Sequence, residues 1–508
     1  MVSSAKLLIL KNAIANVLRG ASSAAVAVIL PPLLTRQMTP EVYGAWALIL
    51  QCSAHVGRLD FGIQTAVGRF VAHASERGDM EYRNRLVSTA FVALLAACGL
   101  ALAVAAGIAY LVPFLFPQMT PALYRHASIA LILVASSLAL GLPSGVFNGV
   151  FVGQQRSEIP ACTIGGSRLV SAALLVLAAN SGASLPTLGA IIAGVNVASY
   201  VLQYALFRWL AGDVQLSVRL ADRRAARELW SYCYSLTIWS FSMLLVTGLD
   251  LTIVGAFDFA ALPYYAVAAS LVTFIAGLQT AIFGALLPST AVLHARGNSL
   301  ELGRLVITSS RYGLFLLLLT GLPLMVWAEP ILRLWVGSAY AANGAWFLRV
   351  LVAANIVRLS ATPYSVALIG TGQQKLVTIS PLGEGVTNLL ASLAGAWMFG
   401  GIGVAAGTMV GALVGVTLNL TYNMRRTTEI SFCVRDYLRE SLARPMACAV
   451  PFLFLAAMPD LNSYPLLWRM TPVLLAVAGA LYLAWSLGFE KQERAWLKAT
   501  LSRSATSA

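Results

Sequence analysis

Eight charged side chains lie within long apolar stretches of the sequence, where a charge is expensive to place. They are Arg19, Arg58, Asp60, Arg168, Asp250, Arg349, Arg358 and Glu384. An ionised group near the centre of a bilayer costs about 2.5–3.5 kcal/mol on insertion scales. Such groups usually face a wet cavity or an opposite charge, so these residues are the first candidates for binding or transport.

Polar residues accompany the deepest of these charges at helical spacing. Asn355 precedes Arg358 by three residues, and Glu384 is followed at i+4 and i+8 by Asn388 and Ser392. These faces predict a polar, water-filled interior between apolar helices. An alternative stays open, in which Arg358 and Glu384 form a buried ion pair that only holds two helices together.

The sign of the embedded charge indicates the class of ligand. Five of the eight residues are arginines and three are acids, so the set is net positive. A chamber for cationic drugs should be negative, whereas a positive one suits a phosphate-bearing substrate. Arginine also binds two phosphate oxygens at once through its planar fork.

The composition is that of a membrane protein. The chain of 508 residues is 59% hydrophobic and only 11% charged, against about 25% charged in soluble domains. Its apolar runs are about 20 residues long and do not alternate with polar residues, which favours spanning helices over a barrel. The six cysteines and four histidines are scattered, so we expect no metal site, no cofactor and no disulfide framework.

The apolar runs predict an all-α protein with about 14 transmembrane helices. The expected spans are residues 12–34, 42–70, 86–111, 127–151, 159–179, 185–207, 229–257, 262–293, 305–327, 346–370, 376–399, 402–422, 445–458 and 466–487.

Short matches between distant segments indicate an internal duplication. Gly153-Gln154-Gln155 returns as Gly372-Gln373-Gln374, and Arg77-Gly78-Asp79 returns as Arg296-Gly297-Asn298, each 219 residues later. A third match, from residue 64 to residue 279, is close to that spacing. We therefore predict a six-helix lobe at 1–211, a basic cytoplasmic linker at 212–228, a second six-helix lobe at 229–426, and two extra helices with a tail at 427–508.

The distribution of basic residues predicts the orientation in the membrane. Of the 34 Lys and Arg residues, 25 fall in loops on the side of the N-terminus, four on the opposite side and five within spans. Both termini are therefore expected in the cytoplasm of an inner-membrane protein. Each lobe then begins and ends on that side, so the lobes are parallel repeats with a path between them. The basic segment 208–228 is either an amphipathic segment on the inner leaflet or a plain linker.

Three motifs carry a family resemblance: residues 34–46 (LTRQMTPEVYGAW), 59–63 (LDFGI) and 66–70 (AVGRF). They resemble the polysaccharide-transport, or O-antigen flippase, family of the multidrug/oligosaccharidyl-lipid/polysaccharide exporter superfamily. The resemblance implies a V-shaped bundle of two lobes. It also implies alternating-access transport of undecaprenyl-pyrophosphate-linked oligosaccharides from the inner to the outer leaflet, often coupled to protons or sodium. The partners implied are the lipid-linked oligosaccharide, membrane lipids, and the glycan polymerase and chain-length machinery.

On this hypothesis the embedded residues divide into two groups. Arg358, Arg58, Arg168, Asn355 and, at the cytoplasmic mouth, Arg19 are expected to bind the pyrophosphate and sugar acids. Glu384, Asp60 and Asp250 are expected to carry a coupling ion. Arg19 and Arg168 could instead extend to the interface. The net charge of +14 is assigned to cytoplasmic loops rather than to nucleic-acid binding.

Three other functions stay in view. A multidrug exporter or a lipid II flippase would use the same fold, although the positive chamber argues against the exporter. A membrane glycan polymerase or ligase would need a substantial external loop, and the longest expected here is 328–344. No H-E-x-x-H, G-x-S-x-G or Walker motif is present, so we expect a transporter without catalytic residues.

Overall fold

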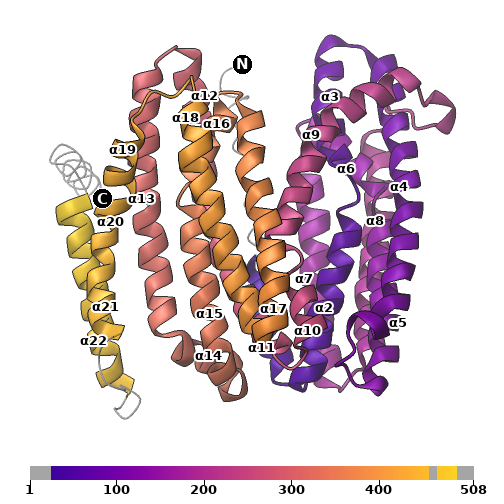
Figure 1. Cartoon of the computed structure of the whole chain (residues 1–508). Helices are drawn as coiled ribbons and strands as arrows, with labels where there is room; N and C mark the ends of the chain where they lie inside the picture. Colours follow the sequence, from indigo (N-terminus) through magenta and orange to yellow (C-terminus); the bar gives the residue numbers. More distant parts are fainter. Residues whose placement is uncertain (1–23, 457–465, 489–508) are drawn as a thin grey trace, which may run out of the picture. The chain divides into compact units, whose positions relative to one another are not determined.

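The computed structural model of the chain describes residues 24–456 and 466–488 (Figure 1). All regular structure in these residues is helical, as the sequence predicts. Nine helices of the described part are long and apolar enough to cross a membrane. The chain is therefore a multi-pass helical membrane protein.

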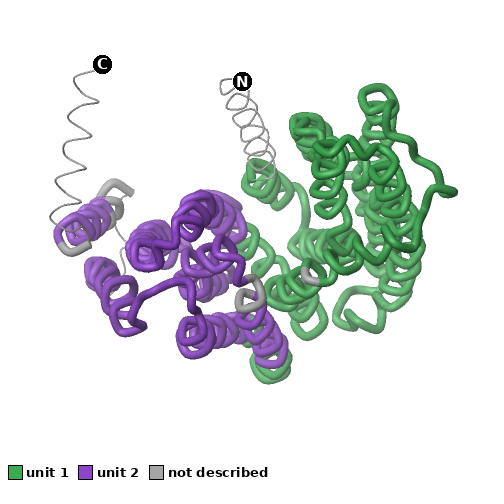
Figure 2. The backbone as a smooth tube through the Cα atoms, turned by 90° about the horizontal axis from the view of Figure 1, so that it is seen from above, with its two compact units in different colours: residues 1–270, 393–404 green, residues 271–392, 405–508 purple. Residues whose placement is uncertain are grey.

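The chain folds into two compact units, which Figure 2 colours separately. Residues 1–270 and 393–404 form the first unit, and residues 271–392 and 405–508 form the second. These units are divided by contacts, whereas the predicted lobes at 1–211 and 229–426 are divided by sequence repeat. The lobe boundaries stay a prediction.

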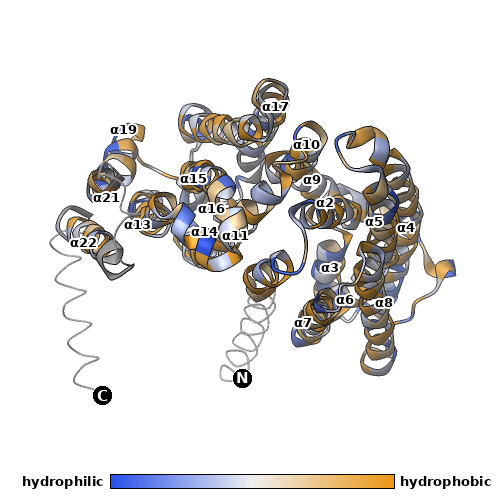
Figure 3. Cartoon of the chain, turned by 90° about the horizontal axis from the view of Figure 1, so that it is seen from below, coloured by the Kyte–Doolittle hydropathy of each residue, from blue (hydrophilic) through white to orange (hydrophobic). Residues whose placement is uncertain are grey.

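The first described helix of the first unit is short and covers Ala24–Thr35. The unit continues with α2 (Pro40–Gly57), α3 (Ile63–Arg77), α4 (Met80–Leu115), α5 (Pro121–Leu140), α6 (Ser144–Gly153), α7 (Glu158–Asn180), α8 (Leu185–Leu210), the 3₁₀ turn η1 (Val218–Leu220), α9 (Arg223–Thr247), α10 (Asp250–Phe257) and the start of α11 (Leu262–Gly284). Helices α4, α5 and α8 lie side by side (Figure 1). Their colouring in Figure 3 is largely hydrophobic, and on α4 Tyr110 and Phe114 are 74% and 71% exposed. Such a surface fits lipid rather than water as its solvent.

The second unit holds the rest of the helices: most of α11, then α12 (Leu287–Ala295), α13 (Ser299–Val326), α14 (Ala328–Val336), α15 (Ser338–Leu359), α16 (Thr362–Gly370), most of α17 (Gln374–Leu418), α18 (Met424–Arg426), α19 (Val434–Tyr437), α20 (Arg444–Met446), α21 (Val450–Ala456) and α22 (Leu466–Leu483). The two C-terminal helices pack on α13. Phe315 of α13, Phe452 of α21 and Ala480 of α22 belong to one buried cluster.

Several predicted spans are pairs of helices joined by a break. The span expected at 42–70 divides into α2 and α3 at Phe61 and Gly62, whose φ angles are 50° and 75°. The span expected at 127–151 divides at Pro143, which precedes the first residue of α6. The span expected at 346–370 divides before Pro363, near the start of α16. Proline removes a backbone donor and its ring crowds the preceding turn, which favours a break at these two positions.

A single glycine separates the spans expected at 376–399 and 402–422. The chain stays helical along α17 except at Gly400, which adopts φ 60° and ψ −141°. Asp258 accepts a hydrogen bond from the backbone N–H of Gly401 at 3.0 Å. The carboxylate therefore fixes the turn that the glycine makes possible.

The repeated motifs occupy the same local structures. Gly78 and Gly297 both end a helix with left-handed φ angles, 69° and 68°. The next residue caps the following helix in each case, Asp79 on the N–H of Tyr82 and Asn298 on that of Glu301. These positions need a residue without a Cβ and then a short acceptor, which explains why the tripeptide recurs.

The Gly-Gln-Gln match shifts by two residues in the structure. In the first copy the left-handed residue is Gln155, with φ 61°, and in the second it is Gly372, with φ 75°. The N–H of Arg156 bonds to the carbonyl of Phe151, as that of Gln373 bonds to Leu368. The turns correspond at a spacing of 217 residues rather than 219.

Candidate functional site

Arg358 and Glu384 form an ion pair in the second unit. Arg358 stands in the last turn of α15 and donates from Nε to Oε1 of Glu384 on α17. The side chains are only 19% and 9% exposed. Within the described part of the chain, the buried Nη2 of Arg358 has no hydrogen-bond partner. The structure therefore contains the ion pair of the alternative interpretation, and whether the pair does more than join two helices stays a prediction.

A glycine stripe on α17 holds the Glu384 face against a second helical segment. Gly407, Gly411 and Gly415 recur every fourth residue, opposite Glu384, Asn388 and Ser392. A Cβ at Gly415 would lie 2.6 Å from Oε2 of Glu384, and one at Gly411 would lie 2.7 Å from Cβ of Asn388. Small residues at this spacing let membrane helices approach closely. The stripe is readable in the sequence, but the sequence reasoning missed it.

Asn355 belongs to a buried amide network beside this pair. Its Nδ2 donates to Oε1 of Gln279 at 3.0 Å, and Nε2 of Gln279 donates to Oγ1 of Thr320 at 2.7 Å. Asn355 and Gln279 are 6% and 2% exposed. Gln279 appeared in the sequence only as part of a repeat, and its polar side chain in an apolar run was the signal that could have identified it.

Arg58 lies in the first unit, at the break between α2 and α3. It is exposed, and among the described residues no carboxylate forms an ion pair with it. Arg58 lies close to Gly248: a Cβ placed on this glycine would be 3.0 Å from Nη1 of the arginine. The carbonyl of Gly248 accepts a hydrogen bond from Nε2 of Gln51 on α2 at 2.6 Å. Asp250 starts α10 two residues later. The breaks after α2 and α9 thus meet, and they bring Arg58 near the beginning of α10.

The remaining predicted residues have separate surroundings. Asp60 accepts a hydrogen bond from the N–H of Gly62 at 3.2 Å, so one of its oxygens supports the break itself. Arg168 is exposed on α7. Arg19 lies outside the described residues. The structure therefore joins Arg358 to Glu384, and it places Arg58 and Asp60 at one break.

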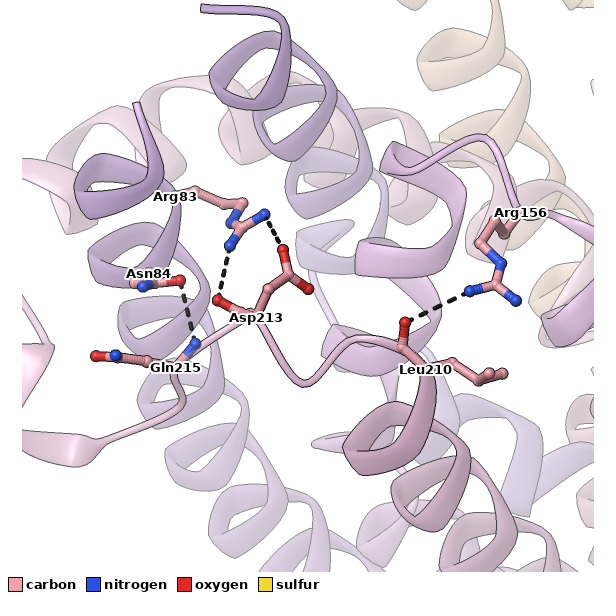
Figure 4. Close-up of polar contacts among 6 residues, drawn as sticks. All are labelled: Arg83, Asn84, Arg156, Leu210, Asp213 and Gln215. Atoms are coloured by element: carbon pink, nitrogen blue, oxygen red, sulfur yellow. Dashed lines mark hydrogen bonds and ion pairs between the residues drawn. The ribbon is translucent and has the colours of Figure 1, made fainter. Parts of the chain in front are cut away.

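The segment after α8 is docked along α4, as Figure 4 shows. We call residues 211–222 the first strap. Arg83 of α4 donates from Nη1 to Oδ2 of Asp213 at 2.7 Å and from Nη2 to the Asp213 carbonyl at 2.8 Å. Asn84 accepts from the N–H of Gln215 at 3.2 Å, and Arg156 donates to the carbonyl of Leu210 at 3.4 Å. The strap continues with Ser88 and Thr89 of α4, which accept from the N–H groups of Ser217 and Asp222.

This docking shows that residues 211–222 are not a free linker, because their backbone and Asp213 are hydrogen-bonded to α4. The only helical turn between α8 and α9 is η1. A position of this segment on the inner leaflet stays a prediction. Arg83, which the sequence reasoning counted among the loop cations, is 3% exposed. Nothing in the sequence alone distinguishes this buried arginine from its exposed neighbours.

A second strap, residues 427–443, lies along α13 in the second unit. The N–H of Ser431 donates to the carbonyl of Ser299 at 3.2 Å, and Oγ of Ser441 donates to that of Ile307 at 3.0 Å. Glu440 pairs with the buried Arg311 at 3.8 Å. Tyr437 is fully buried, and burial raises the pKa of its hydroxyl to about 12, so it stays protonated. In each unit, an acidic residue of the strap therefore forms an ion pair with a buried arginine of the helix along which the strap lies. The pairs are Asp213 with Arg83 and Glu440 with Arg311.

The described residues contain no group of three or more His, Cys, Asp or Glu side chains that could hold a metal ion. The candidate residues in each unit are arginines, carboxylates and amides. Such an arrangement can bind an anion, exchange a proton or both, through groups placed at helix breaks.

Comparison with known proteins identifies the family. A sequence model of the family described as "Polysaccharide biosynthesis protein" matches residues 9–294. A search of curated proteins found no match. Among solved structures, the lipid II flippase MurJ in an inward closed conformation superimposes with a TM-score of 0.68 at 13% identity, covering 94% of this chain and 98% of that one.

Two further structures superimpose over most of their length. An inward-facing multidrug resistance MATE family transporter of the MOP superfamily has a TM-score of 0.66 at 13% identity, covering 82% of this chain and 96% of that chain. A MOP superfamily transporter from Pyrococcus furiosus, described by the reverse polarity of its binding pocket, has a TM-score of 0.50 at 12% identity, with 82% and 95% covered. The family match spans more than half of the sequence, so the chain belongs to the polysaccharide biosynthesis protein family, with the fold of the MurJ and MATE transporters.

Proposed function

We propose that this protein is a flippase that moves undecaprenyl-pyrophosphate-linked oligosaccharide repeat units across the inner membrane, for surface or exopolysaccharide synthesis. The family match supports a role in polysaccharide biosynthesis, and the fold is one that transporters use. Because one fold hosts many activities, the substrate class must be argued from the site.

The observation that carries the proposal is the position of Arg58. Arg58 lies at the break between α2 and α3, in the apolar part of the chain, and it is exposed. Among the described residues, no carboxylate forms an ion pair with it. A free cation at this position suits a phosphate group far better than a cationic drug. Arginine can also grip a pyrophosphate through two parallel hydrogen bonds. In the proposed mechanism Arg58 receives the headgroup while the lipid tail stays in the bilayer.

The ion pair in the second unit supplies a route to coupling. Arg358 is neutralised by Glu384, so it is a weak anion ligand while the pair is intact. A proton that binds to Glu384 cancels its charge and frees Arg358 for a phosphate oxygen. In this scheme proton uptake and substrate binding support each other, and release of the substrate restores the pair.

The proposal extends to place and partners. Both termini are assigned to the cytoplasm by the basic loops, and the glycan polymerase and chain-length machinery would use the product on the opposite side. Alternating access moves the substrate, and no catalytic residue or cofactor takes part.

Substitution of Arg58 tests the proposal in cells that depend on this gene for surface glycan. Arg58→Gln should abolish glycan display and leave lipid-linked repeat units on the cytoplasmic leaflet. Arg58→Lys keeps the charge but loses the fork, so it should be intermediate. Arg36→Gln removes an exposed arginine after the first helix and serves as the matched control. Full display by a stably produced Arg58→Gln protein would refute the role of this residue and the argument built on it.

A further inference from the structure

A cavity of about 800 Å³ lies in the first unit, and Arg58 is not among the residues that line it. The second half of α3, the start of α4 and the turn after α6 form its walls. The Gly153-Gln154-Gln155 turn, which the duplication singled out, is one of these walls. A cavity of this volume is large enough for a small-molecule headgroup.

Two arginines, Arg69 and Arg83, and one acid line the cavity. Arg69 and His73 line it from adjacent turns of α3, and both are exposed. The guanidinium carbon of Arg69 lies 4.8 Å from the ring centroid of Tyr232. This stacking orients the guanidinium but leaves its N–H groups available, and no carboxylate among the described residues pairs with it. Glu76 is the only acid in the lining.

Arg83 lies in the same wall, where Asp213 neutralises its charge. Its two Nη atoms are held by Asp213 of the first strap, and the residue is 3% exposed. Its buried Nε has no partner in the described part of the chain, and neither does Oγ of Ser75, another lining residue. The wall therefore contains two buried polar atoms without a hydrogen-bond partner, and the first strap holds the Arg83 guanidinium in a fixed position.

The depth of the cavity indicates where its ligand comes from. Helix α4 begins at Met80, which itself lines the cavity, and the membrane span expected at 86–111 starts less than two turns further on. The end of a span is the level at which lipid phosphate groups lie. Phe70, Ala72 and Met80 add an apolar side to the basic one, and Met80 is 46% exposed. Free phosphate has no apolar part that could contact such a side, whereas a lipid has glycerol and upper acyl carbons that could.

We propose that this cavity binds the phosphate headgroup of an anionic phospholipid. Arg69 and His73 contact the phosphate, the Gln154 amide contacts the polar headgroup, and Phe70 and Met80 contact the first acyl carbons. The site is distinct from the transport site. Its occupancy does not depend on whether the protein moves lipid-linked glycans.

The experiment uses the full-length protein purified in neutral detergent, and native mass spectrometry counts bound lipid. Dioleoyl phosphatidylglycerol is the probe, with dioleoyl phosphatidylcholine and inorganic phosphate as the other arms. We expect saturable binding of one phosphatidylglycerol. Arg69→Gln should weaken it about tenfold, the equivalent of roughly 1.4 kcal/mol for one charge-assisted contact. Arg77→Gln, an exposed arginine two turns along the same helix that does not line the cavity, should change it less than twofold.

A second variant tests the cavity without changing its charge. Ala72→Trp fills the apolar side and should also weaken phosphatidylglycerol binding, while the melting temperature shows that the protein is folded. Equal losses in Arg69→Gln and Arg77→Gln would mean general surface attraction and would overturn the site. Displacement of the lipid by millimolar inorganic phosphate would make it a soluble-anion site and would overturn the lipid assignment. Because no glycan transport is measured, failure here is distinguishable from failure of the flippase proposal.

Discussion

Replacement of Glu384 by Gln removes one half of the buried pair and keeps the size of the side chain. Arg358 then keeps its charge in a position where it is 19% exposed. Loss of one partner from a buried pair costs about 3–5 kcal/mol, because the other charge is left without compensation. Some water reaches Arg358, and the Gln carbonyl can still accept its hydrogen bond. We therefore expect the lower end of that range, about 3 kcal/mol.

The double variant Arg358→Met/Glu384→Gln distinguishes an ion pair from two independent contributions. With both charges gone, no charge is left buried, and stability should return to within about 1 kcal/mol of the original protein. The single variants should therefore be far from additive, with a coupling free energy of at least about 2 kcal/mol.

Thermal unfolding of the purified proteins in one detergent gives the order of stability. The matched control is Glu329→Gln in the same unit, which removes the half-buried partner of the exposed Arg333 at 2.5 Å on α14. Exposed pairs of this kind contribute about 0–1 kcal/mol. A Glu384→Gln protein as stable as the Glu329→Gln protein, or strictly additive single variants, would contradict the inference that the pair is buried and coupled.

Transport measurements on the same variant test the second role of this residue. If Glu384 carries the coupling ion, Glu384→Gln should change the pH or sodium dependence of glycan transport as well as its rate. A reduced rate with an unchanged dependence would leave Glu384 as a structural residue and remove the coupling scheme.

Two further substitutions test the turn on α17 and the first strap. Gly400→Ala should destabilise the protein by about 1–3 kcal/mol, because its φ of 60° disfavours a Cβ and Asp258 occupies the space; Gly99→Ala on α4, where a Cβ meets nothing within 4 Å, is the control and should lose no thermal stability. Asp213→Ala should cost about 1–2 kcal/mol by leaving buried Arg83 with only a carbonyl acceptor, and trypsin should cut the first strap faster; unchanged cleavage, or equal acceleration in the exposed Glu81→Ala protein, would contradict the docking.

The sequence was sufficient to predict the helices because each of its apolar runs must satisfy its own backbone in lipid. It was insufficient to predict where these helices break. Hydropathy does not register that Pro143 or Gly62 interrupts a span, since glycine and proline are common in membrane helices. This limit affects the candidate site directly, because Arg58 and Asp60 lie at such a break and not on a continuous helical face.

Partner choice was the second limit of the sequence. The stripes around Arg358 and Glu384 predict that both side chains avoid lipid, yet only the packing of α15 on α17 decides that they pair. Arg83 is the converse case, because a cation beside Arg85 in a basic stretch has the pattern of a solvated loop. Its burial depends on Asp213, which is 130 residues away and has no helical periodicity to signal the contact.

The first strap has a consequence for how the chain is made. Synthesis delivers α4 to the membrane well before Asp213 leaves the ribosome, so Arg83 must wait, unneutralised, until more than a hundred further residues are translated. A gene truncated at residue 211 would end after α8 and lack Asp213, so it would leave Arg83 without its carboxylate partner. A split-protein or fusion strategy should therefore keep residues 211–222 on the same fragment as α4.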